Sequence, residues 1–127
     1  MTSDSMTKFL FRLFSIAYIA GIFLFADSSV ISDLSPFNPY SLLHIPLYGI
    51  LMLLLLLSFV PLKFHSTHST DLTHSTRFVL PGVIALTIAI ADEIHQVYVP
   101  GRNASVVDVF LDIVGIALCL LAIKHFS

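Results

Sequence analysis

The chain has 127 residues, enough for one domain, and its composition does not resemble that of a soluble protein. Hydrophobic residues make up 57% of it and charged residues 11%, whereas soluble domains are typically about 45–50% apolar even with glycine counted. The net charge of −2 offers no basic surface for nucleic acid. The single cysteine, Cys119, cannot form an internal disulfide or a Cys-rich metal site, and we expect it to pack inertly in an apolar segment. The composition therefore indicates a membrane protein.

Four apolar segments are long enough to cross a membrane as helices, which takes about 17–25 mostly apolar residues. They are residues 9–25, 42–62, 78–94 and 106–123. Backbone groups in lipid must find their hydrogen bonds within their own segment, so each is predicted to be helical. The sequence thus predicts an all-α integral membrane bundle of four transmembrane helices, forming a single domain over residues 1–127.

The first span could instead be the apolar part of a cleaved signal peptide, because Lys8 and Arg12 precede or open it. Its apolar run is long for such a region, and Leu24-Phe25-Ala26 is a poor cleavage site. We therefore expect an uncleaved first span.

Lysine and arginine are divided unevenly between the two sides of a four-span protein. Five of the six fall on the side of the termini, and only Arg102 falls on the other. Positive residues concentrate in cytoplasmic loops, so both termini are predicted to be cytoplasmic. The connection between the third and fourth spans then lies at the outer face.

The connection at residues 63–77 repeats the triplet His-Ser-Thr, with histidines at His65, His68 and His74. His-rich tracts can bind metal, but the only nearby acid is Asp71. A flexible, polar cytoplasmic loop is the interpretation we favour.

Ionisable residues gather where the third span ends. Asp92 and Glu93 lie in its last turn, where the partial negative charge of a helix end disfavours carboxylates. These acids need a cation, a proton or water. Pro100-Gly101 predicts a tight turn that folds Arg102 back over the helix ends. Arginine can hold a carboxylate or phosphate through two hydrogen bonds.

Two more acids open the fourth span. Ser105 is predicted to be its N-cap, with Asp108 three residues later in a variant of the capping box. Asp112 shares a face with Asp108 and lies roughly 10 Å deeper than Ser105. An acid at that depth costs about 2.5–3.5 kcal/mol, so we expect Asp112 to face the bundle interior, hydrogen-bonded or protonated. Gly115 and Cys119 continue this face with small surfaces suited to close helix contact, and a homo-oligomer could form through them.

Three spans are therefore predicted to converge on one polar pocket at the outer face. Gln96 shares a helix face with Asp92 and Glu93, and the second span adds a histidine and a tyrosine four residues apart. These two could also be a satisfied interfacial histidine and part of an aromatic belt. Ionisable groups inside a membrane indicate a functional site by default, and the alternative is a network that only fixes helix packing. The candidate binding residues are His44, Tyr48, Asp92, Glu93, Gln96, Arg102, Ser105, Asp108 and Asp112.

At these residues the chain resembles the VanZ-like family of small bacterial membrane proteins. The motifs that match are Asp92-Glu93-x-x-Gln96, Pro100-Gly101-Arg102-x-x-Ser105, Asp108, Gly115 and, upstream, His44-x-x-x-Tyr48. The resemblance runs from about Leu42 to the C-terminus, and the first span agrees only in hydropathy. Two positions differ, because the family usually has Asn where this chain has Asp112, and a small glycine-type residue near Cys119.

The resemblance implies a fold of several membrane helices in the bacterial cytoplasmic (inner) membrane and a role in the envelope. Name-giving members of the family confer resistance to teicoplanin, a lipid-tailed glycopeptide antibiotic. We therefore expect the pocket to bind an anionic or amphiphilic envelope molecule, such as a membrane lipid or envelope precursor, or to affect susceptibility to such lipoglycopeptides. Arg102 would contact phosphate or carboxylate, and Asp112 adds a titratable group to the family pattern.

Two other functions fit the same residues. One is a membrane enzyme acting on a lipid-linked precursor, with Glu93, His44 or Asp108 in acid–base chemistry. The sequence has no serine-nucleophile signature, no phosphate-binding glycine loop and no H-E-x-x-H spacing, so no catalytic residue, cofactor or metal is assigned. The other is a subunit of a small proton-coupled transporter, in which Asp108 and Asp112 carry protons. No clear inverted repeat supports it.

Overall fold

A computed structural model describes residues 2–26, 39–60, 73–102 and 104–126. These residues form four long helices and one short 3-10 helix, with no strand among them: α1 (Ser3–Ala26), η1 (Pro39–Leu43), α3 (His44–Phe59), α4 (Thr73–Val97) and α5 (Val106–Phe126). Four stretches are long and apolar enough to cross a membrane, one in each long helix, with the second beginning in η1. The predicted all-α bundle with four membrane spans is confirmed.

The helices α1, α4 and α5 extend beyond the apolar segments from which they were predicted. By contrast α3 ends at Phe59, inside the predicted span 42–62, and Val60 is extended. α4 begins at Thr73, so residues 73–77 of the predicted flexible loop are helical, while residues 61–72 lie outside the described residues. Hydropathy marks where apolar residues end, but helical hydrogen bonding continues into polar turns beyond them. In the same way α1 starts at Ser3, well before the apolar run that opens at Phe9.

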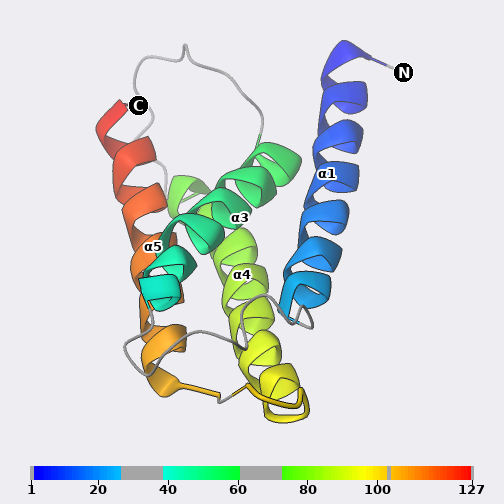
Figure 1. The fold of residues 1–127 in the computed structure, drawn as a ribbon. Helices are drawn as coiled ribbons and strands as arrows, with labels where there is room; N and C mark the ends of the chain where they lie inside the picture. Colours follow the sequence, from blue (N-terminus) through cyan, green and yellow to red (C-terminus); the bar gives the residue numbers. More distant parts are fainter. Residues whose placement is uncertain (1, 27–38, 61–72, 103, 127) are drawn as a thin grey trace.

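The helix α3 lies at the centre of the bundle. It packs against α1, α4 and α5, and crosses the middle of the molecule in Figure 1 with α1 on one side and α5 on the other. The buried side chains of α3 are Tyr48, Leu51, Met52, Leu55, Leu56 and Ser58. Ile22 of α1, Ala85 and Ala89 of α4, and Ile116 of α5 complete the core around them.

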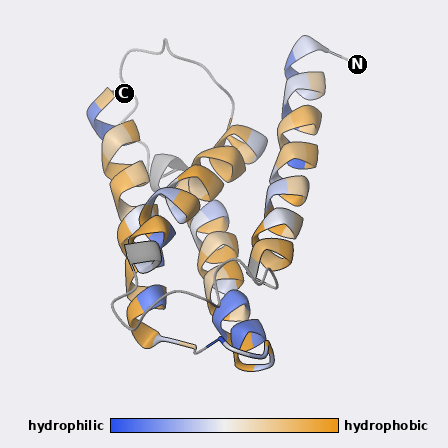
Figure 2. Cartoon of the chain, viewed as in Figure 1, coloured by the Kyte–Doolittle hydropathy of each residue, from blue (hydrophilic) through white to orange (hydrophobic). Residues whose placement is uncertain are grey.

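The outer surface of the helices is apolar, with large residues such as Phe14, Leu24, Phe110 and Leu121 exposed. A membrane protein turns such residues toward lipid tails. Figure 2 shows a group of hydrophilic residues where α4 ends and α5 begins, besides others on α1 and near the end of α5. Both ends of the chain lie at the opposite end of the bundle from that connection (Figure 1). Which of the two ends faces the cytoplasm stays a prediction from the distribution of lysine and arginine.

Hydroxyl groups connect α1 to α3. The Oγ atoms of Ser15 and Ser58 are 3.1 Å apart, and the Tyr18 hydroxyl donates to the carbonyl oxygen of Leu47 at 2.9 Å. Lipid tails are as apolar as leucine, so hydrogen bonds between helices and close packing hold membrane helices together. These two contacts place α1 against the bundle although most of its surface is exposed.

The helices α3 and α5 approach each other closely at Gly49 and Gly115. A Cβ on Gly115 would overlap the carbonyl oxygen of Ile45, and a Cβ on Gly49 would lie 3.4 Å from the carbonyl oxygen of Gly115. Small residues allow this approach because no side chain stands between the backbones. The predicted close helix contact is confirmed at Gly115, and it lies within the chain. A homo-oligomer through the face of Gly115 and Cys119 stays a prediction.

Candidate functional site

The connection between α4 and α5 folds as a tight turn. The Arg102 N–H donates to the carbonyl oxygen of Val99 at 3.1 Å, and Gly101 has a φ of 81°. Glycine adopts this φ without strain, and Pro100 supplies the fixed φ that the preceding turn position needs. The turn predicted at Pro100-Gly101 is confirmed, and it brings Arg102 back beside the end of α4.

Ser105 caps α5, as the sequence predicts. Its Oγ accepts a hydrogen bond from the Val107 N–H at 3.2 Å. The capping box itself is different, because the Ser105 N–H donates to Glu93 Oε2 at 2.8 Å. A carboxylate from α4 therefore fills the role that the sequence assigned to Asp108. Glu93 ties the start of α5 to the end of α4, and Asp108 faces α3 instead.

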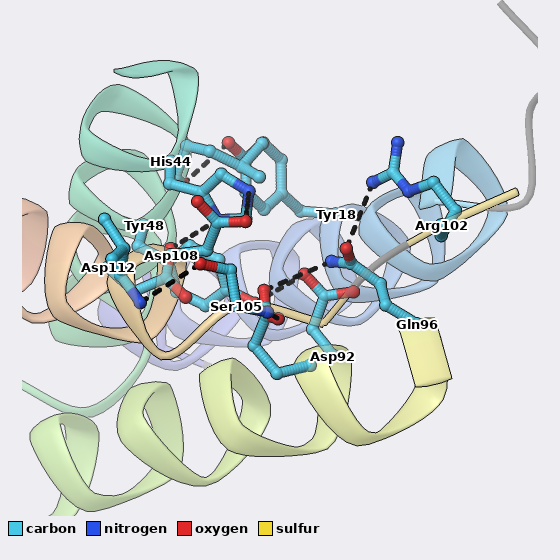
Figure 3. A network of polar contacts seen from close by, with 12 residues as sticks. Tyr18, His44, Tyr48, Asp92, Gln96, Arg102, Ser105, Asp108 and Asp112 are labelled. Atoms are coloured by element: carbon cyan, nitrogen blue, oxygen red, sulfur yellow. Dashed lines mark hydrogen bonds and ion pairs between the residues drawn. The ribbon is translucent and has the colours of Figure 1, made fainter. Parts of the chain in front are cut away.

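His44, the first residue of α3, lies between the two acids of α5 (Figure 3). Its Nδ1 is 2.7 Å from Asp112 Oδ1, and its Nε2 is 3.9 Å from Asp108 Oδ2. The close approach at Gly115 explains this contact, because Gly115 lies about one turn from Asp112 and packs against Ile45, the neighbour of His44. Asp112 is fully buried, so the prediction that it faces the interior is confirmed.

Tyr48 lies one turn along α3 from His44 and reaches α4. Its side chain is fully buried, and its hydroxyl donates to Asp92 Oδ2 at 3.3 Å. The rings of Tyr48 and His44 are parallel, with their centroids 6.3 Å apart. The structure thus places Tyr48 in the interior between helices and not in an interfacial aromatic belt.

Gln96 connects Glu93 with Arg102. Its Nε2 donates to Glu93 Oε1 at 3.3 Å, and its Oε1 accepts from Arg102 Nη2 at 3.3 Å. The sequence predicts that Arg102 folds back over the helix ends, where a guanidinium can hold a carboxylate or a phosphate. In the structure no carboxylate of the described residues lies within 4.0 Å of the Arg102 guanidinium, and the amide of Gln96 stands between.

The structure brings together all the predicted binding residues, which we call the polar cluster: His44, Tyr48, Asp92, Glu93, Gln96, Arg102, Ser105, Asp108 and Asp112. Its four acids are each 8% exposed or less. Within the described chain three of their oxygens have no hydrogen-bond partner, namely Asp92 Oδ1, Asp108 Oδ1 and Asp112 Oδ2. A buried polar group left without a partner costs about 1–3 kcal/mol, and more when it is charged. The polar cluster therefore has unused capacity for a hydrogen-bond donor or a cation.

An apolar groove lies beside the polar cluster, between α4 and α5. Its volume is about 220 Å³, and it is lined by Ile90, Glu93, Ile94, Val97, Ala104, Ser105, Val106 and Val109. Glu93 and Ser105 also belong to the polar cluster, where they bond to each other. The groove and the polar cluster therefore meet at these two residues.

Two residues near the polar cluster had no role in the sequence-based prediction. Tyr18 of α1 lies beside it in Figure 3, although its hydroxyl bonds the carbonyl of Leu47. The ring of His95 contacts that of Phe23 edge to face, with centroids 5.4 Å apart. For Tyr18 the sequence does carry a signal, because a tyrosine hydroxyl inside an apolar span needs a hydrogen-bond partner.

Comparison with known families shows to which family the chain belongs. The family model VanZ/LLP1 matches residues 9–127, nearly the whole chain. The chain belongs to the VanZ/LLP1 family. This match includes most of α1, for which the sequence motifs gave no support beyond hydropathy. No curated protein and no solved structure matches the chain. With four helices that can cross a membrane, it is a VanZ-like multi-pass membrane protein.

Proposed function

We propose that this VanZ-like protein binds an amphiphilic molecule of the bacterial envelope. The polar cluster takes the headgroup and the groove between α4 and α5 takes an alkyl chain. The observation that carries the proposal is that the two meet at Glu93 and Ser105. A ligand with an apolar chain and a polar head is the class that matches both surfaces at once.

The polar cluster suits a headgroup with both an anionic group and hydrogen-bond donors. Arg102 is partly exposed and bonds Gln96 through one of its nitrogens, so other guanidinium donors are free for phosphate or carboxylate. The unpartnered oxygens of Asp92 and Asp108 accept hydroxyl or ammonium donors. A membrane lipid or lipid-linked envelope precursor offers this combination. The proposal includes an outer-face position in the cytoplasmic membrane, which rests on the uneven distribution of lysine and arginine.

A variant that fills the groove tests ligand binding directly. Ala104→Trp puts a large ring into the groove, and Ala122→Trp puts the same ring on the exposed surface of α5 away from it. We expect protein purified in mild detergent to retain a lipid that mass spectrometry detects. The bound lipid should fall at least tenfold in Ala104→Trp and remain in Ala122→Trp. Equal retention in both variants would exclude the groove as the binding site.

The protein would change the binding of teicoplanin to cells if its bound molecule is one that the antibiotic contacts at the membrane surface. We expect cells that make the protein to bind less labelled teicoplanin than cells without it. Vancomycin lacks the lipid tail, and its binding should not change. Arg102→Ala should restore teicoplanin binding, whereas Arg77→Ala, at an exposed arginine on α4, should not. Unchanged teicoplanin binding at verified expression would remove the antibiotic part of the proposal.

One contact favours a second candidate function, an enzyme that acts on a lipid-linked precursor. His44 Nδ1 is held 2.7 Å from Asp112, which leaves Nε2 as a base oriented by a carboxylate. Under this function His44→Gln abolishes conversion of a lipid-linked sugar phosphate by the purified protein, while the retained lipid stays bound. Absence of turnover by the parent protein on this substrate class would leave binding as the function.

A further inference from the structure

Ligand atoms for a metal ion lie together inside the polar cluster. A ring nitrogen of His44, from α3, and carboxylate oxygens of Asp92 and Glu93, from α4, all lie within 4.8 Å of one another. Asp92 and Glu93 are buried, with 2% and 6% of their surface exposed. One imidazole with several carboxylates is a ligand set that suits divalent first-row cations such as Zn²⁺ and Mn²⁺.

The orientation of His44 also suits a metal ligand. An ionised Asp112 carboxylate accepts hydrogen bonds and does not donate them, so with Asp112 ionised the short Nδ1 contact of 2.7 Å puts the ring proton on Nδ1. The lone pair is then on Nε2. A carboxylate that accepts from the far ring nitrogen is the usual companion of a metal-bound histidine, because it fixes the tautomer and raises the basicity of the ligand nitrogen.

Asp108 provides an observation independent of these three ligands. Its Oδ2 is 3.9 Å from His44 Nε2, too far for a hydrogen bond. Its Oδ1 is buried and has no partner among the described residues, although only 8% of Asp108 is exposed. Ligand atoms around a zinc ion at bond lengths of about 2.0–2.2 Å lie roughly 3.5 Å apart, so an ion would draw the ligand atoms of His44, Asp92 and Glu93 together by roughly 1 Å. Asp108 lies close enough to His44 to join them.

Charge balance supports a cation at the same place. Four buried acids face one arginine, and Arg102 bonds to Gln96 and not to any of those acids. Burying an unpaired carboxylate is costly, and a divalent cation offsets two such charges at once. Glu93 keeps its bonds to Ser105 and Gln96, because each carboxylate oxygen has a second lone pair for the ion.

We propose that His44, Asp92, Glu93 and Asp108 form a binding site for one divalent first-row cation, with Asp112 orienting His44. This goes against the sequence-based expectation that no metal is bound. The ligands come from three helices and form no short motif, so spacing along the chain could not indicate them. The proposal does not depend on an envelope ligand, because it concerns binding of the ion alone.

The test uses the full chain in detergent micelles, purified without a polyhistidine tag and stripped with a chelator. Zn²⁺ and Mn²⁺ are titrated separately by calorimetry, and bound metal is counted after gel filtration. The parent for all variants carries His65→Gln, His68→Gln and His74→Gln, because these histidines can bind Zn²⁺ independently. We expect one equivalent of metal per chain in this background.

Substitutions then separate the proposed site from other binding. His44→Gln and Asp92→Asn should each weaken binding at least 100-fold. Asp112→Asn should weaken it about 10–100-fold, the range for a group that orients a metal ligand. Asp4→Asn should change nothing, because Asp4 is an exposed acid paired with Lys8 near the start of α1. Far-UV circular dichroism tests whether each variant is folded. If Asp92→Asn does not fold, the weaker metal binding expected of Asp112→Asn still tests the site.

Two results would overturn the proposal. One is the absence of Zn²⁺ and Mn²⁺ binding once the three loop histidines are replaced. The other is binding that stays equally tight in folded His44→Gln and Asp112→Asn proteins. Either result would mean that the buried acids of the polar cluster are satisfied without a metal ion.

Discussion

The two sides of α3 are held to their neighbours in different ways. On one side, Ser58 meets Ser15 of α1 through hydroxyl groups, and side chains separate the two backbones. On the other side, Gly115 of α5 packs directly on the backbone of α3, and Asp112 bonds His44 in the interior. Apolar burial drives little association in lipid, so closeness of packing and buried polar bonds decide which contact is stronger. The close packing of α3 on α5 therefore holds the His44–Asp112 part of the polar cluster together, while α1 covers the bundle from outside.

The largest loss of stability is expected from Gly115→Leu. The new side chain would overlap the carbonyl of Ile45, so α3 and α5 must separate, at a cost of about 3 kcal/mol. Gly21→Leu on α1 is the matched control, because a Cβ there meets nothing within 4 Å. Thermal unfolding in micelles, followed by circular dichroism, measures both. If the two substitutions destabilise the protein equally, the contrast between the two sides of α3 is wrong.

The next effect is expected from Asp112→Ala. It removes the partner of His44 and leaves a largely buried imidazole N–H unbonded, which costs about 2 kcal/mol. Asp112→Asn retains an acceptor oxygen at nearly the same place, so it should cost less than about 1 kcal/mol. Denaturation in micelles compares the two variants. A larger loss for Asp112→Asn than for Asp112→Ala would contradict the bond to His44.

A smaller free energy is expected for the hydrogen bond between α1 and α3. Hydrogen bonds between membrane helices average about 0.6 kcal/mol in double-mutant cycles. A cycle of Ser15→Ala and Ser58→Ala should give a coupling free energy of about this size. The same cycle with His44→Ala and Asp112→Ala should give a larger coupling. Equal couplings would show that both sides of α3 are held alike.

The smallest effect is expected from Gly49→Ala. The added Cβ would lie 3.4 Å from the carbonyl oxygen of Gly115, at the edge of ordinary contact. Alanine also favours the helix by about 0.5–1 kcal/mol over glycine, which offsets the crowding. Stability should therefore stay within about 0.5 kcal/mol of the parent by the same unfolding measurement. A loss as large as that of Gly115→Leu would mean that both glycines are needed equally.

Much of this architecture could be predicted from the sequence, because the bilayer fixes the length of a span and makes charged groups in lipid unfavourable. Span lengths follow from the thickness of the hydrocarbon core, and the cost of an acid in lipid requires Asp112 to face inward. Local chemistry was equally informative at the Pro100-Gly101 turn and at the Ser105 cap, where the residue type fixes the backbone geometry.

The pairing within the polar cluster could not be predicted in the same way. The bond between His44 and Asp112 joins residues 68 apart and depends on how α3 and α5 are rotated against each other. Likewise the acceptor for the Ser105 N–H comes from Glu93 across the turn, which a rule for a single helix cannot anticipate. Hydropathy also could not locate the start of α4, because its first turn is polar.

The bond between Glu93 and Ser105 has a consequence for the biogenesis of the protein. It joins residues only 12 apart in the chain, and such short loops close quickly and with little loss of chain entropy. We therefore expect α4 and α5 to enter the bilayer as a preformed hairpin. The acids of α5 then cross beside the helix that shares the polar cluster with them, before α3 arranges itself against both.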